Sequence, residues 1–220
     1  APGNPAWDLT GGKFGPYAGQ MFVGDQTIST LVRVQFEQVG KVDQGTMIMF
    51  SRDLASGVMR PCFLPDSSLL LGQTGRGWQS KGGNQAALQR ITWDGKTVPA
   101  DIHHIITESK GLKVVFTAPL RDDVTPAQLL ADCKITSWTY TDAVTYGSRE
   151  NEKRENAVES IVISADRKSI QLRMPEFSQP AQIINRLSNV VFQNPDKLFT
   201  AAPARTPLEA FQTIRAVPQP

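Results

Sequence analysis

The sequence contains the run Gln20-Met21-Phe22-Val23-Gly24-Asp25-Gln26-Thr27, followed by Thr30-Leu31-Val32-Arg33-Val34-Gln35-Phe36. This motif occurs a second time. The second copy is Ser68-Leu69-Leu70-Leu71-Gly72-Gln73-Thr74, followed by Leu88-Gln89-Arg90-Ile91-Thr92-Trp93. Each copy has an apolar run, a glycine, a polar stop and a strand-like run built on Leu-x-Arg-Val/Ile. Repetition at about 45–55 residues is typical of radial repeat architectures, so the motif predicts β-propeller blades.

The repeated motif places about two blades, an incomplete propeller, in residues 1–96. A closed propeller has at least four blades. The last blade has three predicted strands, which are Ser56–Leu64, Leu69–Thr74 and Ala87–Trp93, and its fourth strand is missing. Unpaired strand edges need covering. We therefore expect another chain, or a copy of this one, to complete this part.

From residue 97 to residue 220 the pattern changes to short strands at the spacing of an Ig-like β-sandwich. Ser160–Ser164 and Ser169–Met174 are predicted to form a hairpin that turns at Ala165–Lys168. The side chains expected in the core of this domain are Phe116, Ile135, Trp138, Ile161, Ile163, Ile170 and Leu172. The whole chain is therefore predicted to be all-β, apart from one short helix near its C-terminal end.

Two segments of the second domain are predicted to lie outside its strands. The mixed-charge run from Arg149 to Asn156 reads as a solvated loop, with a recognition element as the alternative. Thr206–Ile214 has a proline in its first turn and apolar residues at helical spacing, so it is predicted to be a short helix.

Composition excludes some partners. The net charge is only +2, from 23 basic and 21 acidic residues, which gives no reason to propose nucleic acid as a partner. No apolar run approaches the ~18 residues of a membrane span. Ala1–Pro5 reads either as the trimmed end of a mature secreted chain or as a cut within a longer one.

Cys62 and Cys133 lack metal-binding spacing and are predicted to be buried free thiols, with a disulfide as the alternative.

Several short phrases together resemble the C-terminal blades of glucose/sorbosone dehydrogenase-like propeller proteins. They are Lys13–Pro16, Gly19–Thr27, Leu31–Val34 and Gly72–Trp78. Residues 101–217 resemble the bacterial Ig-like domain that ends the large multidomain forms. The resemblance implies a six-bladed propeller, pyrroloquinoline quinone and calcium as cofactors of the full assembly, a haem-carrying cytochrome-type partner, and a periplasmic or secreted location. For this chain alone it assigns no cofactor.

Four residues form the candidate ligand site at the ends of the predicted blade strands: Asp25, Gln26, Arg76 and Trp78. Arg76 would bind an anionic group and Trp78 would stack on a ring. The alternative is structural, with an Asp–Arg pair tying two blades together and Trp78 filling a gap between them. No catalytic residue is assigned.

Other candidates are interpreted as structural. His103 and His104 are adjacent on a predicted strand, so their side chains are expected on opposite faces and unable to chelate one ion. Asp122-Asp123 lacks the spacing of a calcium loop and is predicted to be a turn. Since no metalloprotease, phosphate-loop or serine-hydrolase motif is present, no autonomous active site is expected.

Three functions stay open. In the first, the chain is a structural or assembly segment, or subunit, of a larger dehydrogenase-like protein, completed by other chains. In the second, it contributes one wall of a quinoprotein sugar dehydrogenase site. In the third, the Ig-like domain is a carbohydrate- or surface-binding module. The sequence does not identify the substrate or the partner. It also does not decide whether the chain is a fragment or a natural subunit.

Overall fold

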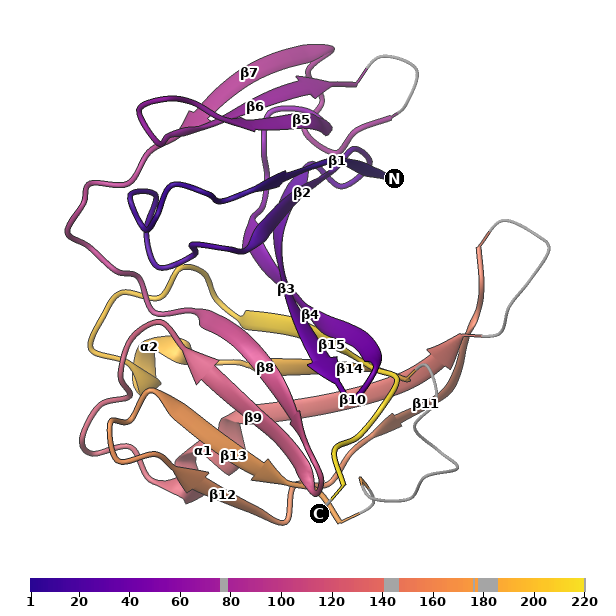
Figure 1. Ribbon diagram of the computed structural model, residues 1–220, viewed down its shortest axis with the longest axis vertical. Coiled ribbons are helices and arrows are strands. Elements are labelled where there is room, and N and C mark those ends of the chain that lie inside the picture. The colour runs from indigo at the N-terminus through magenta and orange to yellow at the C-terminus, as the bar shows by residue number, and fades with distance from the viewer. Residues whose placement is uncertain (76–78, 141–146, 176, 178–185, 220) are drawn as a thin grey trace. The chain divides into compact units, whose positions relative to one another are not determined.

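A computed structural model describes residues 1–75, 79–140, 147–175, 177 and 186–219 (Figure 1). These residues form antiparallel sheets with two short helices, and none of the sheets that they form closes into a barrel. The predicted all-β class is confirmed. The chain divides into two compact units, the first made of residues 1–35 and 47–98 and the second of residues 36–46 and 99–220.

Unit 1 is built from two sheets. One has the strand order β1-β2-β3-β4, and the other, three-stranded, has the order β5-β6-β7. β3 and β4 form a hairpin whose tip, residues 36–46, is counted with unit 2. The strands are β1 (Pro2–Trp7), β2 (Met21–Asp25), β3 (Thr30–Val39), β4 (Val42–Ser51), β5 (Val58–Phe63), β6 (Leu69–Thr74) and β7 (Ala86–Ile91).

An aromatic and aliphatic cluster forms the core of unit 1. Phe22 is fully buried, and its ring meets those of Phe14 and Phe50 edge-on at centroid distances of 5.6 and 5.1 Å. The buried members of the cluster are Phe14, Tyr17, Phe22, Leu31, Leu54, Val58, Leu69 and Leu71. Edge-to-face aromatic pairs add to the stabilisation that comes from burying apolar area. Four of these eight residues, Phe22, Leu31, Leu69 and Leu71, come from the apolar runs of the repeated motif, which therefore contribute half of this core.

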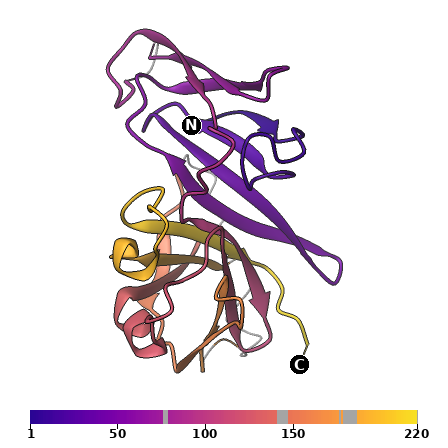
Figure 2. The same cartoon turned by 90° about the vertical axis from the view of Figure 1, so that its left-hand side faces the viewer.

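Unit 2 also has two sheets. One has the order β15-β14-β10-β11 next to the β3–β4 tip, and the other has the order β12-β13-β9-β8 (Figures 1 and 2). The rings of Phe116 and Phe192, from opposite sheets, lie 5.5 Å apart. The elements are β8 (Ile102–Glu108), β9 (Gly111–Phe116), α1 (Pro126–Asp132), β10 (Cys133–Tyr140), β11 (Glu150–Glu155), β12 (Ser160–Ile163), β13 (Ser169–Arg173), β14 (Arg186–Phe192), α2 (Pro195–Leu198) and β15 (Leu208–Ile214).

The predicted hairpin and most of the predicted core of unit 2 are confirmed. Ile161 pairs with Leu172, and Ile163 pairs with Ile170, across β12 and β13. Ile170 is fully buried, whereas Ile163 is only half-buried. The other predicted core residues, Phe116, Ile135, Trp138, Ile161 and Leu172, are buried.

The helix predicted for Thr206–Ile214 is wrong, because Leu208–Ile214 is the strand β15. Every second side chain of β15 is buried, which is the period of a strand and not of a helix. The strand pairs along its whole length with β14, from Arg186↔Ile214 to Phe192↔Leu208. Long-range pairing therefore overrides the helix signal of the proline and the apolar spacing.

The mixed-charge run is also not a loop. Glu150–Glu155 forms β11, the outer strand of its sheet, paired only with β10 in the part of the chain that the structure describes. Charged side chains are a common way to protect an edge strand from pairing with other chains. The prediction that this run is solvated holds for most of its side chains, but the prediction of a loop is wrong.

The helix α1, which is the one helix longer than a single turn among the described residues, was not predicted from the sequence. Thr125 caps α1 through a capping box, in which its hydroxyl accepts from the backbone N–H of Gln128 and the Gln128 side chain accepts from the N–H of Thr125. Pro126 occupies the first turn, where it costs no hydrogen bond. These are local signals of a helix start, and they were readable in the sequence.

Candidate functional site

The predicted ligand residue Asp25 ends β2 and holds the following turn. Its Oδ1 accepts hydrogen bonds from the backbone N–H groups of Thr27 at 2.8 Å and Ile28 at 2.7 Å. Gln26 follows in the same turn, and its N–H donates to the carbonyl of Ala1. Arg76 and Trp78 lie outside the described residues, so the meeting of Asp25 with Arg76 stays a prediction.

The prediction that the side chains of His103 and His104 lie on opposite faces of the strand is wrong, because their rings are in contact. The Nδ1 atoms lie 2.6 Å apart and the ring centroids 4.9 Å apart. The pairing of β8 with β9 shifts between Ile102 and His104, so His103 lies in a β-bulge. A bulge interrupts the alternation of side chains between the two faces of a strand. The sequence rule for adjacent strand residues therefore fails at this point.

Asp122 and Asp123 form the predicted turn. The guanidinium of Arg121 donates to the Asp123 carboxylate at 2.6 and 2.9 Å, and these hydrogen bonds lower the pKa of that carboxyl. Calcium takes six to eight oxygen ligands. Among the residues that the structure describes, no group of three or more His, Cys, Asp or Glu side chains is placed to hold a metal ion.

The outer face of the β5-β6-β7 sheet is a first candidate surface, which we call the outer blade face. Cross-strand rows Cys62–Leu70–Arg90 and Arg60–Gly72–Leu88 form it. Leu88 is 70% exposed and Cys62 is exposed, whereas Leu69 and Leu71 of the inner face are fully buried. The free Cys62 thiol corrects the prediction that both cysteines are buried. An exposed apolar strip with arginines at its rim has the composition of a contact surface.

The second candidate is a cavity at one end of unit 2. On the inner face of β14 the side chains change from apolar to polar along the strand, in the order Phe192, Val190, Ser188 and Arg186, and all four are buried. The neighbouring strands repeat this change, because Ser137 of β10 pairs with Ser188, and Gln212 of β15 pairs with the same residue. The core between the two sheets therefore ends in a buried polar layer.

Two arginines reach this polar layer. Arg154 of β11 pairs with Ser137, and the side chain of Arg186 is only 8% exposed. The guanidinium of Arg186 lies 3.4 Å from the hydroxyl of Ser137, which is held by the Asn156 amide at 2.9 Å. The Nη2 atom of Arg186 lies 3.7 Å from a carboxylate oxygen of Glu152.

The cavity has a volume of about 140 Å³. Its polar lining is Arg154, Glu155, Asn156, Arg186 and Ser188, and its apolar lining includes Met174, Phe177 and Ile214. An arginine fork suits a carboxylate or another planar anion. The arrangement can therefore hold a small group that is anionic at one end and apolar at the other.

Sequence reasoning missed Arg154, Asn156 and Arg186. The alternation Arg186-x-Ser188-x-Val190-x-Phe192 is a strand pattern whose polar end could have been read from the sequence. The position of Arg154 beside Ser137 depends on the register of β11, which a single sequence does not show.

Comparison with protein-family models, with curated proteins and with solved structures finds no match for this chain. No helix in the described segments is both long and apolar enough to span a membrane.

Proposed function

We propose that this chain is the C-terminal propeller-plus-Ig-like segment of a larger glucose/sorbosone dehydrogenase-like protein or complex, and that its role is structural assembly. Unit 1 supplies blade-like sheets, and unit 2 supplies an Ig-like β-sandwich. The repeated motif and the phrases of the family resemblance support this proposal. The observation that carries it is the outer blade face.

A blade in a propeller packs both of its faces against neighbouring sheets. In unit 1 the inner face of β5-β6-β7 is buried, whereas the outer blade face exposes Leu88 and Cys62. Covering a leucine side chain that is left in water contributes about 1.5–3 kcal/mol. Arg60 and Arg90 lie on the same face and are exposed, so they would form a polar rim around the contact. The occupant that fits this face is another antiparallel sheet.

A second copy of the chain is the available sheet with which to test docking. We expect sedimentation analysis of the purified chain to show concentration-dependent association, and Leu88→Lys to weaken it at least about tenfold by placing a charge in the contact. Val162→Lys is the matched control, since Val162 is an exposed strand residue of unit 2. Equal association of both variants, or a monomer at every concentration, would count against the outer blade face.

A second function, ligand binding by unit 2, is favoured by the cavity. The family resemblance is not needed for this proposal. A cavity of about 150 Å³ accommodates a molecule of the size of benzene. The 140 Å³ cavity therefore suits one terminal group of a ligand, such as the carboxylate end of an acidic sugar. Arg186 would bind the carboxylate and Phe177 or Ile214 would contact its apolar side.

Glucuronate and glucose, titrated separately by calorimetry, test the ligand function. We expect glucuronate to bind and glucose not to, because only glucuronate carries a carboxylate. Arg186→Lys keeps the charge but loses the fork, so it should weaken glucuronate binding about tenfold or more. Arg173→Lys, at an exposed arginine on β13, is the control. Equal binding of the two sugars, or no binding of either, would remove the cavity as an acidic-sugar site.

A further inference from the structure

The two histidines of the chain form a single imidazole pair. His103 and His104 are the only histidines in the sequence, and both lie on β8, the outer strand of the sheet β12-β13-β9-β8. Their Nδ1 atoms are 2.6 Å apart, and their ring planes are inclined at 74°. Both side chains are half-buried, so solvent reaches the pair.

The bulge explains the geometry. Regular alternation would send adjacent side chains to opposite faces, but the pairing with β9 passes from Ile102↔Phe116 directly to His104↔Val115. His103 is therefore the extra residue of the strand. Bulges commonly re-aim a side chain near a functional site. Here the bulge turns both Nδ1 atoms toward one point.

A hydrogen bond between these two atoms requires one Nδ1 to carry a hydrogen and to donate it to the lone pair of the other. Neutral imidazole has one N–H and one bare nitrogen. If the hydrogen of the donor ring moves through solvent from Nδ1 to Nε2, both Nδ1 lone pairs face the same point and both rings stay neutral. No proton is gained or lost overall in this tautomer change.

We propose that His103 and His104 bind one divalent transition-metal ion through their two Nδ1 atoms, with water completing the coordination. Imidazole nitrogen suits zinc, copper and nickel, and copper is bound most tightly of these at a given site. Metal–nitrogen distances of about 2.0–2.1 Å place two ligand nitrogens roughly 2.9–3.4 Å apart. The rings need to separate by less than about 1 Å from their present spacing.

The nature of the site follows from the ligand count. Within the described segments no third His, Cys, Asp or Glu joins the pair in a metal-binding group. The ion would therefore keep several water ligands and bind with modest affinity, as an exchangeable or exogenous ion. This site lies in unit 2 and does not depend on either function proposed above.

Calorimetric titration of the metal-free, untagged chain with ZnCl₂ and with CuSO₄ tests the proposal. The exposed Cys62 thiol is a competing ligand, so all proteins in the comparison carry Cys62→Ser. We expect one ion per chain. His103→Ala and His104→Ala should each weaken binding by about a hundredfold, because the second imidazole binds at a high effective concentration once the first is bound. Gln171→Ala, an exposed change in the same sheet, should bind like the parent.

Proton NMR gives a readout that needs no histidine variant. The chain has two imidazole rings, and substoichiometric Cu²⁺ should broaden the signals of both rings together and before other signals. The proposal is overturned if no ion binds, if binding survives in both histidine variants, or if Cu²⁺ broadens the signals of one ring alone.

Discussion

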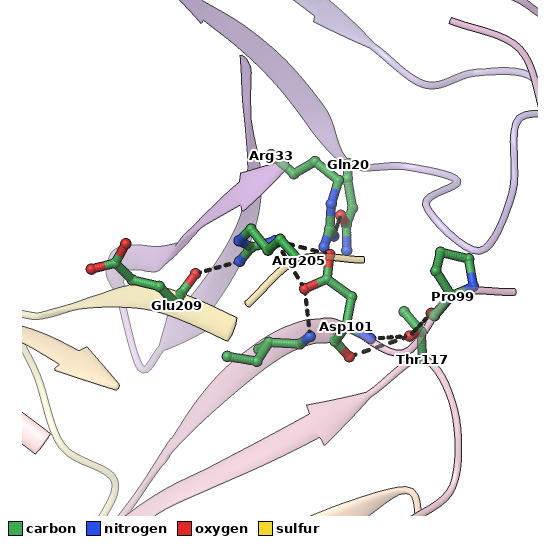
Figure 3. A network of polar contacts seen from close by, with 8 residues as sticks. Gln20, Arg33, Pro99, Asp101, Thr117, Arg205 and Glu209 are labelled. Atoms are coloured by element: carbon green, nitrogen blue, oxygen red, sulfur yellow. Dashed lines mark hydrogen bonds and ion pairs between the residues drawn. The ribbon is translucent and has the colours of Figure 1, made fainter. Parts of the chain in front are cut away.

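Arg205 and Asp101 form a buried ion pair in unit 2, with Nη1 of the arginine 3.2 Å from Oδ1 of the carboxylate (Figure 3). The side chain of Asp101 has no solvent exposure, and its Oδ1 also accepts from the N–H of Ile102 at 2.8 Å. Arg205 donates through Nη2 to the carbonyl of Glu209 at 2.8 Å. The pair thus joins the start of β8 to the segment that leads into β15.

Removing the charge of Asp101 should destabilise the protein strongly. Asp101→Asn keeps the size of the side chain but leaves Arg205 without its carboxylate in a buried position. Breaking a buried pair in this way costs about 3–5 kcal/mol. Urea unfolding of the variant should show this loss in the free energy of unfolding.

The exposed pair Glu159–Arg173, at 2.9 Å, is the control for this experiment. Glu159→Gln should cost less than about 1 kcal/mol, because water already solvates both groups. If the Asp101 variant lost no more stability than the Glu159 variant, burial would not be what makes the Asp101 pair important.

The two glycines of the repeated motif should respond differently to alanine. A Cβ on Gly24 would lie 2.4 Å from Cγ1 and from the carbonyl oxygen of Val58, so β2 and β5 would have to separate. A Cβ on Gly72 would meet Cβ of Arg60 at 3.3 Å. We expect Gly24→Ala to cost about 1–3 kcal/mol or more, by overpacking. Gly72→Ala should change the free energy of unfolding by less than about 1 kcal/mol. Equal effects would show that β2 does not need this close approach.

The stability lost when an isoleucine of the β12–β13 hairpin is shortened to alanine should depend on how deeply its side chain is buried. Ile170→Ala removes a fully buried side chain and should cost about 2–5 kcal/mol. Ile163→Ala, at the paired but half-buried position, should cost clearly less. Thermal and urea unfolding of the two variants measure the difference. A larger loss at Ile163 would contradict the observed burial.

The two cysteines should differ in reactivity. Burial, with a smaller contribution from the charge of Asp132, raises the pKa of the Cys133 thiol from its ordinary 9.0 to about 12. Iodoacetamide at pH 8 should therefore modify the exposed Cys62 and leave Cys133 unmodified until the protein unfolds. Mass spectrometry of the digested protein locates the label, and rapid labelling of Cys133 in the folded protein would contradict this assignment.

The raised pKa of Cys133 also predicts a pH dependence of stability. The thiol of the unfolded chain loses its proton near pH 9, whereas the folded thiol keeps it to about pH 12. The unfolded state is therefore favoured progressively between these two values, and stability should fall as pH rises through this window. Cys133→Ala should remove this contribution to the loss of folding stability at alkaline pH, while Cys62→Ala should not.

Period-2 patterns identified most strands of both units. Leu69–Thr74 was predicted with the bounds that the structure has, and the β12–β13 hairpin was predicted with the right pairing. These patterns were sufficient because the alternation of buried and exposed side chains is a local property of a strand. Leu208–Ile214 shows the limit of such patterns, since a seven-residue segment with apolar residues at mixed spacing was read with the helical period.

The candidate cavity could not be predicted from the sequence. Arg154 and Arg186 are 32 positions apart and meet the same polar layer only because β10 pairs with both β11 and β14. Strand order and register decide such meetings, and a one-residue shift would move every side chain to the other face. The His103–His104 contact was missed for a related reason, because a bulge depends on the pairing with the neighbouring strand.

The arginines of the repeated motif separate what the sequence determined by itself from what the tertiary structure decided. The sequence determined that Arg33 and Arg90 occupy equivalent places on strands, since the alternating apolar residues around them are local signals. It did not determine their surroundings. Arg33 is fully buried and donates to Gln20 (Figure 3). It lies 4.2 Å from the Tyr17 ring, whereas Arg90 is half exposed and pairs with Asp66. Burial depends on which sheet covers each strand, and this follows from packing between segments far apart in the chain.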